Sequence, residues 1–127
     1  MACDKRYGRK TWLIPDAFYN SKYTEGVSHD AVCVLNTSNE DATIHLTLYF
    51  EDRDQMDCFT APCPAGRTHH IRMDRLVGAN GEKVPTDVPY AILVESNVEI
   101  VAQYSRLDTS QAAMALMTTM AFPVDAL

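Results

Sequence analysis

Strict alternation over Ala42–Glu51 is the feature that most limits what this chain can fold into. Every second residue is apolar and falls on one face of an extended segment, and these residues are Ile44, Leu46, Leu48 and Phe50. A period of two fits a β-strand with one buried face, whereas a helix needs a period of 3.6 to gather apolar residues on one side. The sequence therefore predicts a half-buried antiparallel strand.

Three further segments have strand character. Ala31–Leu35 is nearly all apolar, as in a central strand, and the turn formers Asn36–Asp41 connect it to the alternating segment, so these two strands are predicted to form a hairpin. Thr68–Met73 alternates again after a break at Pro62–Gly66. Lys10–Pro15 is predicted as an edge strand.

Two apolar strands around a Ser96–Asn97 turn are predicted within Tyr90–Gln111. The segment Met114–Phe122 has the alanine and methionine content of a helix but follows a strand-rich chain. A final strand is favoured there, with Thr109–Ala113 as a turn of helix leading into it.

The remaining segments are connections. Asp16–Ser28 is expected to be a polar loop, and Asp74–Val77 one helical turn ended by Gly78. Strands about 8 to 12 residues apart with turn signals between them predict an all-β sandwich or barrel. A length of 127 residues without internal repeats suits a single domain over residues 1–127.

The composition is that of an ordinary folded domain. Apolar residues make up 46% of the chain and charged residues 22%, which argues against disorder. No run approaches the ~18 apolar residues of a membrane-spanning helix, and the basic start of the chain lacks the apolar core of a secretory signal. A cytoplasmic location is therefore expected.

Net charge and cysteine spacing limit the kinds of partner and cofactor that this chain is expected to bind. The net charge of -6 disfavours nucleic acid, and the basic cluster Lys5–Lys10 has the character of a solvated terminal arm. The 4 cysteines are expected to be free thiols, because Cys58 and Cys63 have neither redox nor zinc-site spacing. No cofactor is expected.

Five motifs lie in order along almost the whole chain: G-R-x-x-W at Gly8–Trp12, S-H-D-x-V-C-x-L-N at Ser28–Asn36, E-D-A at Glu40–Ala42, R-T-x-H-x-R at Arg67–Arg72, and S-N-V-x-I-V-x-Q-x-x-R-L-D-x-x-Q at Ser96–Gln111. By these motifs the chain resembles the sensory rhodopsin transducer family of small bacterial proteins. The segments Asp16–Val27 and Cys58–Pro64 match no motif of that family.

The resemblance implies a jelly-roll-like antiparallel β-sandwich without enzymatic activity, assembled as a homotetramer and similar in shape to carbohydrate-binding modules. It also implies signalling, because the family is named for a protein that docks on the cytoplasmic side of a light-sensing membrane protein. Fold alone does not transfer that role. The partner implied by the resemblance is a membrane photoreceptor, and the polar residues described next predict a sugar-like or acidic small ligand.

Polar residues late in Tyr90–Gln111 are candidates for ligand binding. Arg106 offers a planar fork of donors and Asp108 an acceptor, as a hydroxyl-rich or carboxylate ligand requires, and Gln103 lies nearby. Gln103 and Arg106 point to opposite faces of a strand, so these groups do not all converge. The structural alternative is that Arg106 pairs with Asp108 or with an acid of a neighbouring subunit.

A second set of candidates is predicted to line one pocket, where a sugar ring stacks on the indole and its oxygens bind the imidazole and guanidinium groups: Trp12, His29, His70 and Arg72. The alternatives are core or interface packing for Trp12 and a simple hydrogen bond at a strand end for each histidine.

Metal and hydrolytic sites are disfavoured. His69 and His70 are adjacent and point to opposite faces, and a Ser-His-Asp triad needs convergence in space, whereas Ser28–Asp30 are sequence neighbours. The leading hypothesis is a non-catalytic protein that binds a ligand or a protein partner and relays a signal. An adaptor for a membrane photoreceptor, a metal-dependent enzyme and a DNA-binding regulator are the alternatives.

Overall fold

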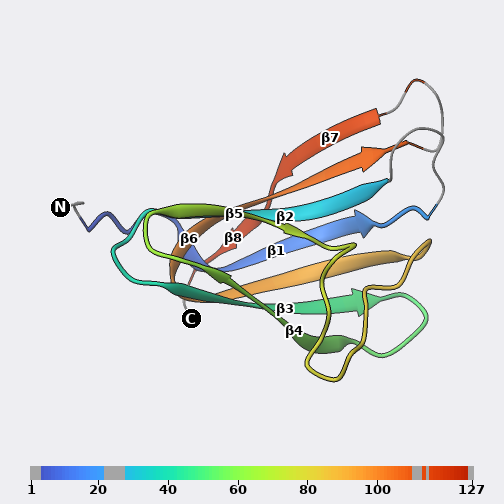
Figure 1. Cartoon of the computed structure of the whole chain (residues 1–127), viewed down its shortest axis with the longest axis horizontal. Helices are drawn as coiled ribbons and strands as arrows, with labels where there is room; N and C mark the ends of the chain where they lie inside the picture. The colour runs from blue at the N-terminus through green and yellow to red at the C-terminus, as the bar shows by residue number, and fades with distance from the viewer. Residues whose placement is uncertain (1–3, 22–27, 110–112, 114, 126–127) are drawn as a thin grey trace.

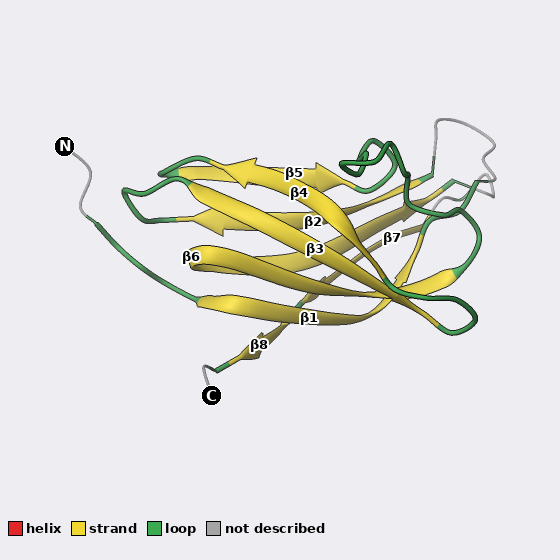
Figure 2. Ribbon diagram, turned by 90° about the horizontal axis from the view of Figure 1, so that it is seen from below, coloured by secondary structure: helices red, strands yellow, loops and turns green. Residues whose placement is uncertain are grey.

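Two antiparallel layers of strands form the molecule (Figures 1 and 2). The computed structural model describes residues 4–21, 28–109, 113 and 115–125, and these contain no helix. The strands are β1 (Arg9–Phe18), β2 (His29–Asn36), β3 (Ala42–Phe50), β4 (Met56–Cys63), β5 (Arg67–Arg72), β6 (Pro89–Asp108), β7 (Ala115–Met120) and β8 (Phe122–Val124). The predicted all-β antiparallel sandwich is confirmed.

One strand, β6, belongs to both layers. Its first arm pairs with β3 from Tyr90 to Ser96 and also with β1, which gives sheet A the order β4-β3-β6-β1-β8. Its second arm pairs with β2 from Val101 to Leu107 and also with β7, which gives sheet B the order β5-β2-β6-β7. The strand bends between its arms (Figure 1). Since the arms pair with different sheets and not with each other, the predicted hairpin around Ser96–Asn97 is wrong.

Side-chain hydrogen bonds explain why these turn formers do not make a tight turn. Asn97 accepts a hydrogen bond from the backbone N–H of Thr43 at 2.7 Å and donates to the carbonyl of Asp41 at 3.4 Å, while the Ser96 hydroxyl accepts from the N–H of Val98 at 3.3 Å. Neither Ser96 nor Asn97 has the positive φ of a two-residue hairpin turn. They anchor the bend of β6 against the start of β3.

The predicted hairpin of β2 and β3 is wrong for the same reason. β2 pairs with β5 and β6, whereas β3 pairs with β4 and β6, so the loop between β2 and β3 crosses from sheet B to sheet A. Asn36 stabilises this crossing, because its side-chain amide donates to the carbonyls of Glu40 at 2.7 Å and Cys63 at 3.0 Å. Polar turn residues therefore stabilise a connection between sheets.

The other element predictions have mixed outcomes. The strands predicted over Ala42–Glu51, Thr68–Met73 and Met114–Phe122 are confirmed as β3, β5 and β7 within one or two residues. β1 is not an edge strand, because it lies between β6 and β8. It also continues beyond Pro15, where the sequence predicts its end, because a bulge lies between Ile14 and Ala17.

Strand β4 was missed, and a helical turn was wrongly expected. β4 contains Pro62, which an edge strand tolerates because the absent N–H faces away from the sheet. The segment after β5 forms a hydrogen-bonded turn from Arg72 to Arg75, and Val77 then pairs with Lys83. The expected polar loop 16–28 is wrong at its start, because β1 runs on to Phe18. Its residues 22–27, and residues 110–112 of the expected helical turn 109–113, lie outside the described residues.

The first motif of the chain, Gly8–Trp12, contacts β6 where that strand leaves sheet A. Trp12 is buried in the core, and its indole N–H donates to the carbonyls of Arg9 at 3.0 Å and Ile100 at 3.1 Å. Gly8 has a φ of +102°, and a Cβ placed there would lie 1.8 Å from the Ile100 carbonyl oxygen. Glycine is thus required both by its conformation and by the close approach of the two backbones.

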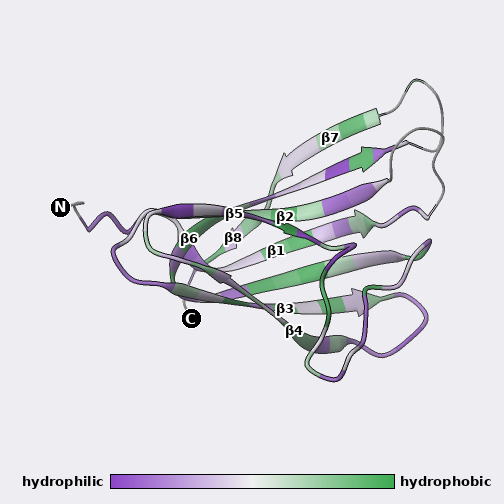
Figure 3. Cartoon of the chain, in the orientation of Figure 1, coloured by the Kyte–Doolittle hydropathy of each residue, from purple (hydrophilic) through white to green (hydrophobic). Residues whose placement is uncertain are grey.

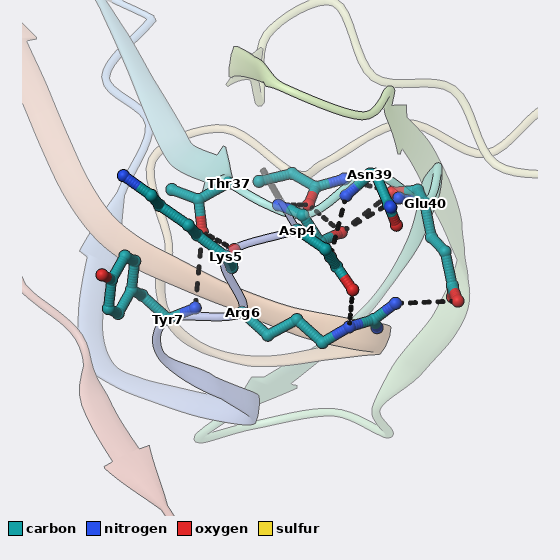
Figure 4. Close-up of polar contacts among 9 residues, drawn as sticks. Asp4, Lys5, Arg6, Tyr7, Thr37, Asn39 and Glu40 are labelled. Carbon is teal, nitrogen blue, oxygen red and sulfur yellow. Dashed lines mark hydrogen bonds and ion pairs between the residues drawn. The ribbon is translucent and has the colours of Figure 1, made fainter. Parts of the chain in front are cut away.

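The residues before Gly8 form an arm that is tied to the loop between β2 and β3 (Figure 4). Asp4 accepts from the N–H of Asn39 at 3.1 Å, and Arg6 forms ion pairs with Asp4 at 3.0 Å and Glu40 at 2.8 Å. Two further hydrogen bonds join Thr37 to the backbone of Lys5 and Tyr7. The arm is solvent-exposed, as predicted for a terminal arm, but hydrogen bonds fix its course.

We expect Gly8→Ala to lower the free energy of unfolding by about 3 kcal/mol, because it adds left-handed backbone strain to a clash with the Ile100 carbonyl. Gly66→Ala is the matched control, since Gly66 has a φ of +65° but open space where its Cβ would lie. That variant should lose only about 1 kcal/mol. Urea denaturation measures both, and equal losses would contradict the role given to the Gly8–Ile100 contact.

Candidate functional site

The outer face of sheet B gathers four of the residues predicted to bind a ligand. His70 of β5 lies opposite Cys33 of β2, which lies opposite Gln103 of β6. Arg72 and His29 occupy other outward positions of β5 and β2, because they are an even number of residues from His70 and Cys33. Three strands far apart in sequence thus place His29, His70, Arg72 and Gln103 on one surface.

A groove of about 430 Å³ lies on this face. It extends from Thr68 and His70 of β5, across Cys33 of β2 and Gln103 of β6, to Thr118 of β7. Its walls also hold Ser105 and the apolar side chains Leu35, Val101 and Leu116. Hydroxyl, imidazole and amide groups beside an apolar strip can bind a ligand that has several hydroxyls and one apolar face.

Arg72 shares the face with this groove, but its guanidinium is engaged elsewhere. Both of its hydrogen bonds go to Asp74, each at 2.7 Å. Partial burial alone would raise the pKa of Asp74, but the two hydrogen bonds and the charge of Arg72 hold that pKa below its ordinary value. His29 also acts on Asp74 through its charge. Arg72 is therefore committed to an ion pair.

Trp12 lies apart from the histidines with which it was predicted to form a pocket. It belongs to β1 in sheet A, is only 5% exposed, and its indole N–H already has two carbonyl partners. The indole therefore packs in the core and offers no ring face to solvent.

Arg106 and Asp108 lie on the inner face of the second arm of β6, opposite in direction to Gln103, as their spacing predicts. A guanidinium nitrogen of Arg106 is 3.8 Å from the Asp16 carboxylate, and the guanidinium carbon lies 5.8 Å from the centre of the Tyr104 ring. The carboxylate of Asp108 accepts from the amide of Asn20 at 3.4 Å. Arg106 and Asp108 thus have partners from the end of β1 and the residues after it.

A buried polar cluster around Asp30 lies between the two sheets and was not predicted. Asp30 is fully buried, directly opposite Arg106 in the β2–β6 ladder, and accepts hydrogen bonds from the hydroxyls of Tyr90 and, at 2.8 Å, Tyr104. Burial raises the pKa of Asp30 above its ordinary value, and it raises the pKa of both tyrosines as well. Within the described residues, Oδ1 of Asp30 and Nε of Arg106 have no hydrogen-bond partner.

The sequence held a signal for this cluster. Asp30 is two residues from Val32 and four from Val34, so alternation places its carboxylate on the same inward face as these two valines. A lone acid on the apolar face of a strand predicts a buried charge with hydrogen-bonding partners.

Other site types find no support within the described part of the chain. Over those residues, no three histidine, cysteine or acidic side chains come together to hold a metal ion, and no helix is long and apolar enough to cross a membrane. The cysteines that the structure describes, Cys33, Cys58 and Cys63, are free thiols.

Two comparisons with known proteins point to one family. The family profile described as Anabaena sensory rhodopsin transducer matches residues 7–123. A crystal structure of Thermotoga maritima 1070 is 32% identical, covers 92% of this chain and 96% of its own, and superposes with a TM-score of 0.82. The structure of the Anabaena sensory rhodopsin transducer is 32% identical, covers 87% of this chain and 94% of its own, and has a TM-score of 0.71. No curated protein sequence matches significantly.

We expect Asp30 to make stability fall as pH rises. Because burial raises the pKa of folded Asp30, the folded state holds this proton more tightly than the unfolded state, in which the pKa is near 3.8. The free energy of unfolding of the wild type relative to Asp30→Asn should therefore fall by about 1.4 kcal/mol per pH unit between 3.8 and the raised pKa. Urea denaturation at stepped pH measures this difference.

Asp74→Asn is the control of opposite sign. The pKa of Asp74 is lowered in the folded protein, so its contribution is present above the ordinary value of 3.8 and is lost as the pH falls through the lowered pKa. Parallel stability curves for the wild type and Asp30→Asn would show that the buried carboxylate does not titrate as described.

Proposed function

Because this chain belongs to the Anabaena sensory rhodopsin transducer family, we propose that it is a non-catalytic cytoplasmic signalling protein that binds a small hydroxyl-rich ligand on the outer face of sheet B and relays this binding to a protein partner. The cross-strand row of His70, Cys33 and Gln103 inside the groove carries the proposal. Family membership supports a signalling role, and the groove supports the ligand.

The groove favours a neutral, sugar-like ligand over an acidic one. Its lining within the described residues holds hydroxyl, imidazole and amide groups but no lysine or arginine. The nearest outward arginine of β5, Arg72, is bound to Asp74 through two hydrogen bonds. A carboxylate ligand would need a free cation for strong binding, whereas sugar hydroxyls pair with neutral donors and acceptors.

The residues predicted to bind a ligand have different roles in this proposal. Gln103 and His70 contact the ligand, and His29 and Arg72 lie on the same face beyond the groove lining. Trp12, Arg106 and Asp108 act from the interior, where they hold the two sheets and the end of β1 in position. A homotetramer is part of the proposal, because the family resemblance implies it.

A second candidate function is docking on the cytoplasmic face of a membrane photoreceptor. The observation that favours it is the match over most of both chains to a protein named as the transducer of a sensory rhodopsin. The two functions are compatible, because a ligand in the groove can modulate docking elsewhere on the surface.

We expect His70→Ala and Gln103→Ala each to weaken ligand binding roughly tenfold, since each removes one hydrogen-bonding group from the groove lining. Native mass spectrometry of the protein purified from its own cells identifies the bound mass, and calorimetry against a panel of sugars and polyols measures the affinities. The matched controls are His45→Ala and Gln55→Ala, which remove the same groups from positions outside the groove. Equal losses in variants and controls would refute the binding site, and turnover of a bound compound would refute the non-catalytic role.

Docking is tested with the purified chain and Anabaena sensory rhodopsin in nanodiscs. We expect saturable binding to rhodopsin-loaded discs and none to empty discs, measured by biolayer interferometry in light and in darkness. Binding that is equal on empty discs would assign the signal to lipid and count against the photoreceptor role.

A further inference from the structure

We propose that a slot between β4 and β5, on the side of the sandwich where the two sheets approach each other, binds the phosphate group of a small phosphorylated compound. This slot is separate from the groove on the outer face of sheet B, and its role goes beyond the proposed function. The proposal rests on two strand edges with unpaired N–H groups, on cationic side chains, and on a described lining without carboxylates.

The slot has a volume of about 340 Å³. β4 is the outer strand of sheet A and β5 the outer strand of sheet B, and the two strands lie side by side (Figure 2). His69 joins them, because its Nδ1–H donates to the carbonyl of Pro62 at 2.5 Å and a carbonyl can only accept. Both residues line the slot, so this bond holds its two sides together.

Both strands leave backbone N–H groups unpaired where they line the slot. Met73 donates its N–H to β2, so alternation leaves the N–H groups of His70 and Arg72 on the free edge of β5. The carbonyl of Pro62 faces the free edge of β4, and alternation places the N–H of Thr60 on that edge as well. These three N–H groups have no partner among the residues that the structure describes. Free N–H groups at the edge of a sheet favour an anion.

The charge of the slot is opposite to that of the whole protein. The chain has a net charge of -6, yet the described lining holds two arginines, two histidines and no aspartate or glutamate. The guanidinium of Arg75 makes no hydrogen bond or ion pair with any described residue, whereas that of Arg72 is bound to Asp74. Arg75 lies in the turn after β5, which Figure 3 shows in hydrophilic colour. Its charge is therefore available to an anionic ligand.

The arrangement of the donors favours phosphate over carboxylate. They come from β4, from β5 and from the turn after β5, and Thr60 adds a hydroxyl to its N–H. A phosphate group offers three strongly accepting oxygens to donors on different sides, whereas a carboxylate offers two oxygens in one plane. The volume falls within the range of ~300–1,000 Å³ typical of small-molecule sites. It leaves room for a small organic group beside the phosphate.

NMR titration of the full chain with inorganic phosphate, at constant ionic strength, tests the site. We expect the backbone amide signals of Thr60, His70 and Arg72 to shift together and to saturate, because their N–H groups gain a charged acceptor. The amides of Ala61 and Ile71 are internal controls, since their N–H groups are paired within the sheets. Glycerol phosphate should give the same shifts at several-fold lower concentration, and weaker binding than inorganic phosphate would overturn the organic part of the ligand.

Arg75→Gln provides the second measurement. Arg75 is exposed, so the fold should be kept, and calorimetry should show phosphate binding weakened roughly tenfold. Arg67→Gln is the matched control, because it removes the same charge from an exposed position of β5 outside the slot lining. It should change the affinity less than twofold. The thermal midpoint of each variant checks that it is folded.

Three results would overturn the phosphate site: no shift of the three amides, equal losses of affinity in Arg75→Gln and Arg67→Gln, or equal shifts with sodium acetate. The second would reduce the effect to net charge, and the third to general attraction of anions. The outcome is independent of the proposed function, because the groove uses the imidazole of His70 and the slot its backbone N–H. Failure to find a sugar ligand would leave the phosphate measurements unaffected.

Discussion

The hydrogen bond from the Trp12 indole to the Ile100 carbonyl, at 3.1 Å, fixes the point on which the two sheets depend. A backbone that leaves one ladder for another has carbonyls that neither ladder satisfies, and a buried carbonyl without a partner is costly. The indole supplies that partner, and Gly8 allows the chains to approach. Ile100 lies between the two arms of β6, so this bond holds the bend of the strand against β1.

Local pattern was sufficient to predict strands and insufficient to predict which strands pair. Alternation located β3 and β5 within one or two residues, because side-chain direction depends only on neighbouring backbone. The composition of Asn36–Asp41 and Ser96–Asn97 predicts hairpin turns, although both segments connect different sheets. Turn composition signals a change of direction and carries no information on the partner strand. β4 escaped prediction because Pro62 counts against a strand unless its edge position is known.

The sequence predicts the strand face on which each candidate residue lies. It does not predict which residues from different strands come together. The spacing of Gln103 and Arg106 correctly assigns them to opposite faces of one strand. The convergence of His70 with Gln103 depends on β2 lying between β5 and β6, which is a long-range pairing that no local spacing encodes. Asp30 was the residue whose role could have been read from alternation alone, since it interrupts the inward apolar positions of β2.

Under the proposed function, the two faces of β2 and β6 would link a ligand in the groove to the buried cluster. Neighbouring residues of the same strands face both ways, because Gln103 lines the groove while Tyr104 bonds to the Asp30 carboxylate inside. A ligand that binds across β2 and β6 favours one spacing of these strands, and a signal requires such a difference in affinity between two arrangements. The Asp30 and Arg106 side chains lie opposite each other on the same two strands. Arg106 also forms an ion pair with Asp16 at the end of β1, so under the proposed function a change in the spacing of β2 and β6 would reach that end of the molecule.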